Sequence, residues 1–285
     1  MRAGILNVCK QSGWTSHDVV AKVRRLARQK RVGHAGTLDP MAEGVLPVLL
    51  GRATRLADLV QSGDKEYRAE VHLGVATTTD DAEGELLERA AVPPFDRDAI
   101  EAALARFRGR ISQLPPAYSA IKVQGQRAYA VARRGGAPDL RPRDVTISDL
   151  RLVDFGSDWL ALDVRCSRGT YVRALARDLA VALGSVGHLT RLVRTAVGPF
   201  RIRDALTLDD IAAQGVAAAL LPPDRALPDA PAHLATVDEA RLLTNGQSVS
   251  TTLRADRVWV RDQAGCVVCL GSADGQVLRS RVLLV

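Results

Sequence analysis

The residues with the clearest potential for chemistry lie in the segment Gly33-His34-Ala35-Gly36-Thr37-Leu38-Asp39-Pro40. Asp39 follows a turn bounded by glycines, and Pro40 biases it towards an extended backbone. A carboxylate on such a turn is well placed to face a ligand. Asp followed by Pro is also typical of the N-cap and first position of a helix, here one beginning at Met41. The local pattern leaves both interpretations open and favours the structural one.

Other catalytic patterns are missing from the sequence. Gly33-x-x-Gly36 is not followed by the Lys-Ser/Thr pair of a phosphate-binding loop, and there is no G-x-S-x-G nucleophile motif. The five histidines show no metal-ligand spacing. Cys266-Val267-Val268-Cys269 is a single CxxC in a strand-like run, where ordinary packing is the better interpretation than zinc binding. We therefore expect no bound metal.

Composition indicates a globular protein, and its positive charge is compatible with an anionic partner. The 285 residues include 39 Lys+Arg and 32 Asp+Glu, a net charge of +7, and 34 of the basic residues are Arg. The planar guanidinium suits phosphate recognition, although the coding bias of a GC-rich genome gives the same ratio. Hydrophobic residues make up 47%, which excludes wholesale disorder, collagen-like sequence and a coiled-coil rod.

Localisation and assembly follow from what the sequence lacks. The N-terminal residues do not resemble a signal peptide, and no apolar run approaches the ~20 residues of a membrane span. We expect a cytoplasmic protein that does not bind membranes. No heptad pattern or long exposed apolar stretch argues for assembly, so we expect a monomer.

The elements around Asp39 begin with a helix. Thr15-Ser16-His17-Asp18 forms a capping-box pattern, and apolar residues follow at helical spacing. The run from Lys22 to Arg31 carries six basic residues and no acid. Such a run is usually a solvated face, but here it leads directly into the segment that contains Asp39.

Further along, strands and helices do not alternate regularly. Residues 65–73 and 160–166 alternate apolar and polar side chains, which predicts two strands with one buried face each. Residues 98–110 and 172–179 have helical periodicity. We therefore predict an α+β fold with a mixed, mainly antiparallel sheet flanked by helices.

Two domains are expected. The proline-rich stretch 221–231 reads as a linker, and beyond it three short strand-like runs predict a small β-barrel. We place a catalytic domain at 1–228, with a basic insertion at about 118–145, and a second domain at 231–285. The insertion contains five arginines and one acid between Arg127 and Arg143, which predicts a basic loop or a short helix within one.

The sequence resembles a known family, the TruB-type tRNA pseudouridine synthases. The segment from Gly33 to Val48 is similar to the catalytic motif of that family, and four further blocks follow in register. These blocks are Lys65-Glu66-Tyr67-Arg68, Pro115-Pro116-Ala117-Tyr118-Ser119-Ala120-Ile121-Lys122, Arg165-Cys166-Ser167-Arg168-Gly169-Thr170-Tyr171-Val172-Arg173 and Gly187-His188-Leu189-Thr190-Arg191-Leu192-Val193-Arg194-Thr195. The C-terminal unit resembles, on weaker motifs, the PUA-type RNA-binding barrel of the family.

Two positions depart from the family pattern. Gln11 stands where a proline is usual, and Val193 stands where an arginine is common. The second change could remove one RNA contact. Neither position belongs to the residues that the resemblance assigns to the chemistry.

The resemblance implies a cofactor-free isomerisation of uridine and assigns three catalytic residues. Asp39 is the essential carboxylate, which attacks the nucleotide or assists departure of the base. Tyr67 stacks on the uracil and takes part in proton transfer, although alternation alone also allows a core position. Arg173 pairs with Asp39; by itself it would be a solvated helix arginine.

Three further residues are implied to bind the substrate. Tyr171 and Leu192 match residues that line the uracil pocket, although Leu192 alone would be assigned to the core. His34 matches the residue that packs against the disturbed RNA loop, and would otherwise be a surface turn residue. The target base must leave its stack before the reaction.

The resemblance implies that tRNA is the partner, through its T-arm and, by way of the C-terminal domain, its acceptor stem. The implied reaction converts uridine 55 of the T-arm to pseudouridine. Two alternatives remain: an RNA-binding or tRNA-folding protein with incidental isomerase activity, and a pseudouridine synthase for another RNA. Basic residues that we expect to contact the RNA backbone are Lys10, Arg24, Arg25, Arg28, Lys122, Arg127, Arg133, Arg134 and Arg143.

Overall fold

The chain forms two compact units in the computed structural model, which describes residues 3–119, 121–123 and 125–285. Unit 1 comprises Met1–Pro40, Gly44–Gly63 and Val197–Val285, and unit 2 comprises Met41–Glu43 and Asp64–Ala196. Unit 2 is therefore an insertion within unit 1 along the chain. No helix of the described residues is both long and apolar enough to cross a membrane.

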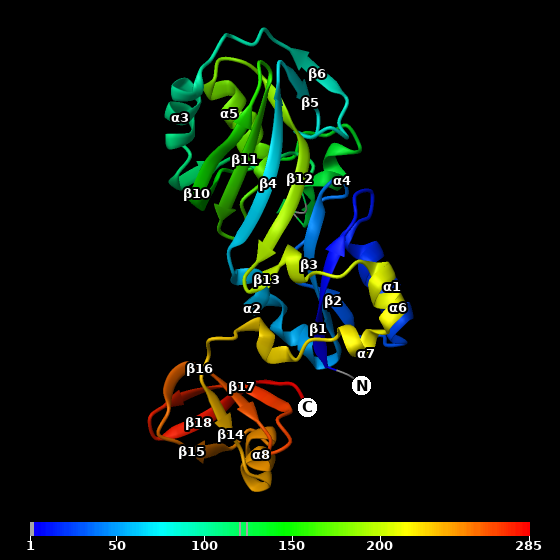
Figure 1. Ribbon diagram of the computed structural model, residues 1–285, viewed down its shortest axis with the longest axis vertical. Coiled ribbons are helices and arrows are strands. Elements are labelled where there is room, and N and C mark those ends of the chain that lie inside the picture. Colours follow the sequence, from blue (N-terminus) through cyan, green and yellow to red (C-terminus); the bar gives the residue numbers. More distant parts are fainter. Residues whose placement is uncertain (1–2, 120, 124) are drawn as a thin grey trace. The chain divides into compact units, whose positions relative to one another are not determined.

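Unit 2 is built on a sheet with the strand order β12-β4-β11-β10-β7 (Figure 1). Its strands are β4 (Lys65–Leu73), β5 (Val75–Thr77), β6 (Leu86–Arg89), β7 (Gly109–Gln113), β8 (Lys122–Val123), β9 (Gln126–Arg127), β10 (Arg143–Phe155), β11 (Trp159–Cys166) and β12 (Gly187–Val197). Its helices are α3 (Arg97–Ala105), α4 (Ala128–Ala132) and α5 (Val172–Ala182). Strands β5 and β6 form one separate hairpin, and β8 and β9 form another.

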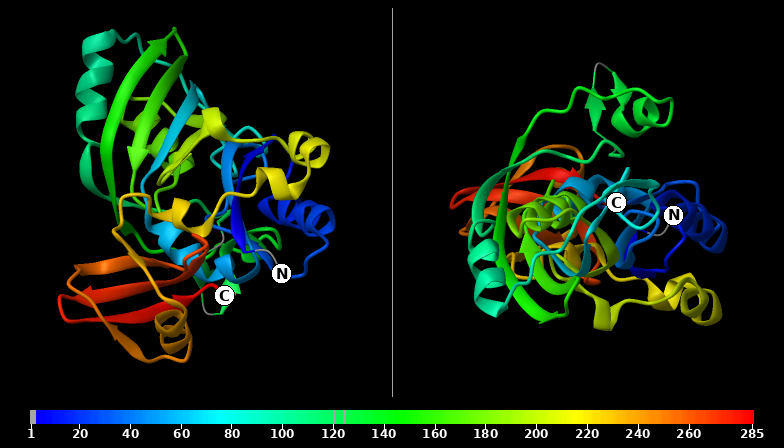
Figure 2. Two further views of the ribbon diagram at one scale, coloured as in Figure 1. Left: turned by 60° about the horizontal axis from the view of Figure 1, so that its bottom comes forward. Right: turned by 90° about the horizontal axis from the view of Figure 1, so that it is seen from above.

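Alternation of side chains gives the main sheet its buried face. Along β11, Leu160, Leu162, Val164 and Cys166 are each at most 2% exposed, as the period of two predicts. Strand β4 buries Ala69, Val71 and Leu73 in the same way. Helix α5 packs on β4, and α3 lies along β10 and also contacts α5 (Figure 2, left). The predicted strands at 65–73 and 160–166 are confirmed.

Unit 1 contains elements from both ends of the chain. Those before the insertion are β1 (Gly4–Lys10), α1 (Ser16–Ala27), β2 (Val32–His34), β3 (Glu43–Leu50), the 3-10 helix η1 (Gly51–Leu56) and α2 (Ala57–Ser62). Those after it are β13 (Phe200–Arg201), η2 (Ile202–Asp204), α6 (Leu208–Gln214), α7 (Val216–Ala219), η3 (Pro223–Ala226), β14 (Ala232–Leu234), α8 (Val237–Thr244), β15 (Ser248–Ser250), β16 (Arg254–Arg261), β17 (Val267–Asp274) and β18 (Val277–Leu283).

The N-terminal elements of unit 1 follow local rules. Strands β1 and β3 pair antiparallel, with Gly4 opposite Leu50 and Lys10 opposite Gly44. The predicted capping box begins α1: the Thr15 hydroxyl accepts from the backbone N–H of Asp18, and the Asp18 carboxylate accepts from that of Thr15. Val19, Val20 and Val23 then face the core.

The C-terminal segment is a five-stranded sheet in the order β14-β16-β17-β18-β15, with β14 parallel to β16 and the other strands antiparallel. It has a small core of its own, which includes Val258, Val260 and Leu278. The predicted α+β class with mixed, mainly antiparallel sheets is confirmed. Closure of the C-terminal sheet into a barrel and the domain limits 1–228 and 231–285 stay predictions.

Two expectations about individual segments were wrong. The helix predicted over 98–110 ends at Ala105, because the chain turns at Gly109, with φ 87°, and enters β7. The proline-rich stretch 221–231 is packed rather than an exposed linker. Asp224 and Ala226 are buried there, and Trp259 Nε1 donates to the carbonyl of Leu227 at 2.8 Å.

Candidate active site

Asp39 lies in unit 1, half-buried, in the turn between β2 and β3. No helix begins after it, because the chain enters β3 at Glu43. The interpretation of Asp39 as an N-cap is therefore wrong, and capping no longer explains why an aspartate stands at this position.

Ser16 holds the residue before Asp39. Its hydroxyl oxygen accepts from the N–H of Leu38 at 2.9 Å and donates to the carbonyl of Leu38 at 3.1 Å. Ser16 is 2% exposed and is the first residue of α1. One buried side chain therefore satisfies both backbone groups of Leu38 and ties the turn to the start of a helix.

Lys10 holds the residue after Asp39. Its ammonium donates to the carbonyl oxygens of Pro40, Trp14 and Gln11 at 3.0, 2.7 and 2.9 Å, and the residue is 1% exposed. These bonds match the three donors of an ammonium, which contradicts our prediction that Lys10 contacts the RNA backbone. Because Gln11 contributes its backbone carbonyl, its substitution for the usual proline leaves this contact in place.

Arg173 lies in unit 2, in the first turn of α5, and its side chain is 5% exposed. Its guanidinium lies 3.2 Å from the Asp81 carboxylate and donates to the carbonyls of Thr79 at 2.9 Å and Tyr118 at 3.0 Å. Asp81 is buried as deeply, so this ion pair is largely removed from solvent. Its partners fix the direction of the guanidinium.

Asp81 is a functional candidate that the sequence interpretation missed. It lies in the turn between β5 and β6, where its carboxylate accepts from the Thr79 hydroxyl and from the backbone N–H of Glu83. Its own carbonyl accepts from the Thr77 hydroxyl at 2.6 Å. A Cβ on Gly84 would lie 2.7 Å from the nitrogen of Thr79, so this turn requires a glycine. The Thr/Asp/Gly composition signalled a turn but not a partner for Arg173.

A second ion pair reinforces the same turn. Asp80, with φ 58°, places its carboxylate 2.8 Å from the Arg177 guanidinium, one helical turn after Arg173. Burial raises the pKa of Asp80 above its ordinary value, against the lowering effect of Arg177. The two neighbouring aspartates thus hold two arginines on one face of α5.

Tyr171 immediately precedes α5 and is held by Gln113. The Gln113 amide accepts from the N–H of Tyr171 at 2.8 Å and donates to its carbonyl at 3.0 Å. Gln113 is 2% exposed at the end of β7. This clamp sets the start of α5 and hence the position of Arg173, and the sequence interpretation missed it as well.

Tyr67 and Leu192 lie on neighbouring strands of unit 2, β4 and β12. Tyr67 is half-buried opposite Val164 of β11, on the alternation face that also carries Ala69. Leu192 is 5% exposed, which is compatible with a core role as well as with a pocket wall.

Lys65 lies two residues before Tyr67 on β4, on the same face of the strand, and is buried. Burial, followed by the nearby positive charge of Arg194, lowers the pKa of Lys65 to about 8. Arg194 is itself 1% exposed. Opposite Lys65 in the register lies Cys166, whose thiol pKa burial raises to about 11. Lys65 and Arg194 are therefore two buried basic side chains that lie near one another in unit 2.

His34 ends β2 in unit 1, where its ring meets that of His17 edge-on at 5.7 Å between centroids. His34 and Asp39 thus belong to unit 1, whereas Tyr67, Tyr171, Arg173 and Leu192 belong to unit 2. Within each unit the predicted residues gather on few elements. Their assembly around one uridine, and the pairing of Asp39 with Arg173, stay predictions.

The predicted RNA-backbone residues are mostly exposed. Arg24, Arg25 and Arg28 lie at the C-terminal end of α1, and the Arg24 guanidinium donates to the carbonyl of Val32 at 3.0 Å. Arg133, Arg134 and Arg143 are exposed in unit 2. The side chains of Lys122 and Arg127 lie outside the described part of the chain. RNA contact at these positions stays a prediction, as does any effect of Val193.

Comparisons with known proteins identify the family of this chain. The chain matches the model of the N-terminal domain of TruB family pseudouridylate synthases over residues 24–172. It matches that of the tRNA pseudouridylate synthase B C-terminal domain over residues 173–227. It is 46% identical to tRNA pseudouridine synthase B of Thermobifida fusca over 95% of this chain and 94% of that one. The corresponding protein of Caldanaerobacter subterraneus is 41% identical over 98% of both chains.

Solved structures show the fold. A Cbf5-Nop10-Gar1 complex superposes with a TM-score of 0.74 at 25% identity, covering 99% of this chain and 85% of that one. An H/ACA RNP bound to a substrate RNA containing 2'-deoxyuridine gives the same TM-score at 23% identity and equal coverage. Fold and sequence matches together define a pseudouridine synthase, an isomerase. Within that class the chain belongs to the TruB family.

Proposed function

We propose that this protein converts uridine 55 in the T-arm of tRNA to pseudouridine, with Asp39 as the essential carboxylate. The proposal rests on membership of the TruB family, whose relatives are named tRNA pseudouridine synthase B. The observation that carries the catalytic assignment is the double clamp on the Asp39 turn, formed by Ser16 and Lys10. A carboxylate held this firmly, and not used as a cap, has the rigidity that a reacting group requires.

The reaction exchanges one bond of the uridine for another. The N1–C1′ bond breaks and its electron pair leaves with the base; the base rotates, C5 bonds to C1′, and the proton on C5 is lost while N1 gains one. Asp39 stabilises the positive character that develops at C1′, by direct attack or by assisting departure of the base. No outside oxidant, reductant or energy source is needed.

The other residues have supporting roles in the proposal. The Tyr67 ring stacks on the uracil and its hydroxyl moves a proton, while Tyr171 and Leu192 form the walls of the pocket. Arg173, directed by Asp81, pairs with the Asp39 carboxylate and orients it. His34 packs against the RNA loop from which the uridine has been turned out, a step that costs a few kcal/mol.

The test uses T-arm RNA labelled with tritium at uracil C5, because formation of the C5–C1′ bond releases the label. The wild-type protein is expected to release tritium, and Asp39→Asn is expected to reduce release by at least about 1000-fold while RNA binding is retained. Asp58→Asn, an exposed carboxylate on α2, is the matched control and retains full activity. Release by Asp39→Asn at the control rate would refute the assignment.

The choice of RNA needs its own comparison. Release from intact tRNA and from the isolated T-arm, with none from an unrelated uridine-bearing hairpin, is the expected pattern. Release from the hairpin alone would identify another RNA as the target. Binding of tRNA without release from any substrate would identify an RNA-binding or RNA-folding protein.

We extend the proposal to the C-terminal sheet, which we assign to the acceptor stem. Its exposed arginines include Arg257 on β16 and Arg281 on β18. Reversing both charges is expected to weaken binding of intact tRNA while binding of the isolated T-arm remains unchanged. Equal weakening for both RNAs would refute this assignment.

A further inference from the structure

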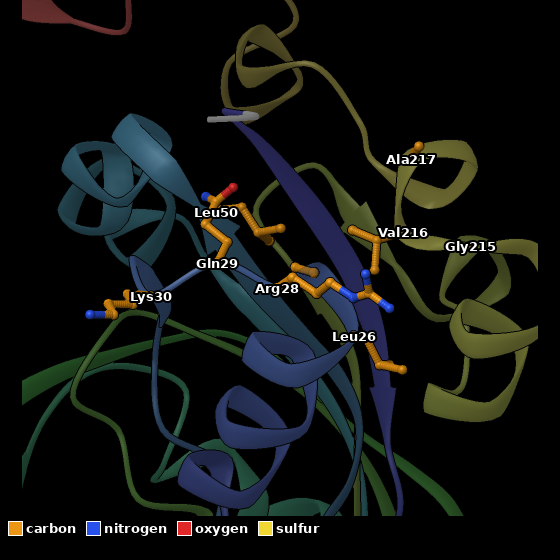
Figure 3. A pocket seen from close by; sticks show the side chains of 9 residues that line it. Leu26, Arg28, Gln29, Lys30, Leu50, Gly215, Val216 and Ala217 are labelled. Carbon is orange, nitrogen blue, oxygen red and sulfur yellow. The ribbon is translucent and has the colours of Figure 1, made fainter.

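A hollow in unit 1, away from the Asp39 turn, has the properties of a nucleotide site. It has a volume of about 730 Å³ and lies between the C-terminal end of α1, the end of β3 and the turn joining α6 to α7 (Figure 3). Leu26, Leu50, Val216 and Ala217 form its apolar lining, and Arg28 and Lys30 carry its charge. The volume lies within the range of small-ligand pockets.

Arg28 adopts an unusual backbone conformation at this hollow. It is the C-cap of α1 with φ 48° and ψ 41°, the left-handed region that helices usually fill with glycine. For a residue with a Cβ, this conformation costs about 1 kcal/mol or more in conformational strain. In Figure 3 its side chain extends towards Val216, whereas Lys30 points away from the hollow. In the described part of the chain the Arg28 guanidinium has no ion pair.

The charge and the apolar lining of the hollow indicate which kind of ligand it can bind. Both charged residues of the lining are cations, and the neighbouring surface of α1 carries Arg24 and Arg25 with no acid nearby in sequence. An anionic ligand with a flat apolar part satisfies this lining. A nucleotide meets both demands, because a base can lie on the aliphatic side chains under the planar guanidinium while its phosphate meets the positive charge.

The distance from the catalytic turn excludes the target uridine itself. The hollow lies at the C-terminal end of α1, whereas Ser16 at the N-terminal end binds the residue next to Asp39. Twelve helical residues separate these ends by about 18 Å. A nucleotide in the hollow is therefore not an immediate neighbour of a uridine held at Asp39.

We propose that the hollow between α1 and the α6–α7 turn binds one unpaired nucleotide of the substrate tRNA, stacked under Arg28, as a second anchor away from the reacting uridine. This inference rests on the proposed function in taking tRNA as the partner. It assigns the strained conformation of Arg28 to RNA recognition.

Arg28→Gly separates this role from a structural one, because glycine relieves the left-handed strain and removes the guanidinium. The variant is expected to unfold at higher urea concentration than the wild type, yet to bind intact tRNA between about 5-fold and 100-fold more weakly, the range for loss of one stacking side chain. Ala217→Trp, which fills the hollow without changing charge, is expected to weaken binding similarly. Arg52→Gln, an exposed arginine on η1, controls for loss of one charge and changes the Kd by less than about 3-fold.

The occupant is identified by placing a photoreactive amino acid at position 217 and crosslinking intact tRNA. A crosslink to one unpaired nucleotide, lost in the Arg28→Gly background, supports the proposal. Crosslinks confined to base-paired stems, no crosslink, or unchanged Kd for both Arg28→Gly and Ala217→Trp would overturn it. Tritium release by the wild-type protein is measured on the same tRNA, so failure of the proposed function is detected separately.

Discussion

Replacing Ser16 by alanine would remove the clamp next to Asp39 without touching the carboxylate. The Ser16 hydroxyl bonds both the N–H and the carbonyl of Leu38, and all of these groups are buried. An unsatisfied buried polar group costs about 1–3 kcal/mol. Because two such groups arise and the turn can partly relax, we expect Ser16→Ala to lower the free energy of unfolding by about 2–4 kcal/mol.

The effect on catalysis follows from the position of Asp39 directly after Leu38. A misplacement of about 1 Å of a reacting group costs on the order of 100-fold in rate. The kcat for tritium release should therefore fall by about 100-fold. KM for the T-arm RNA should change by less than about 5-fold, because residues elsewhere hold the RNA backbone in the proposed function.

Urea unfolding and steady-state tritium release with T-arm RNA measure the two effects. Ser62→Ala is the matched control, because that exposed hydroxyl donates to the carbonyl of Leu59 at the end of a short helix. It should change stability by less than about 0.5 kcal/mol and leave kcat unchanged. If Ser16→Ala kept the wild-type kcat while folded, the argument that Ser16 positions Asp39 would be wrong.

Two further predictions concern buried charges in unit 2. Asp81→Asn leaves the Arg173 guanidinium buried without its anion, so we expect the free energy of unfolding, measured in urea, to fall by about 3–5 kcal/mol and kcat to decrease. The control Asp163→Asn, in a solvent-exposed pair, should lower the free energy of unfolding by less than about 1 kcal/mol. Equal losses in the two variants would contradict this prediction. Burial lowers the pKa of Lys65 from 10.5 to about 8, so burying the charged ammonium destabilises the folded state. This destabilisation is fully present below pH 8 and is lost as the pH rises to 10.5. Relative to Lys65→Met, the wild type should gain up to about 3 kcal/mol between pH 7 and 10.5, and parallel stability curves would refute the shift.

Periodicity predicted much of the fold, because strands β4 and β11 and helix α1 bury one face each. The backbone structure around Asp39 was harder to predict. An Asp-Pro pair is a local signal for a helix start, whereas the pairing of Lys10 with Gly44 draws the following residues into a strand. Tertiary pairing therefore overrode the capping signal.

The buried polar residues of the candidate site had the weakest signal in the sequence. We predicted that Lys10 contacts the RNA backbone, although three carbonyls surround its ammonium. Asp81 and Gln113 act on Arg173 and Tyr171 from 92 and 58 residues away along the chain. Such partnerships depend on how the sheet brings turns against α5, which no local pattern encodes.

The shared core of unit 1 has a consequence for how the protein is made. Ile5, Val45 and Leu56 pack in one cluster with Trp259, Leu270 and Leu284, so the core beneath β1 and β3 is completed by residues about 200 or more positions later in the chain. A ribosome delivers all of residues 64–196 before it reaches Trp259, so unit 2 can close its core first. The core that includes Ala35, next to the proposed catalytic turn, then closes only after residues 197–285 have been added, so we expect it to become ordered later than unit 2 during synthesis.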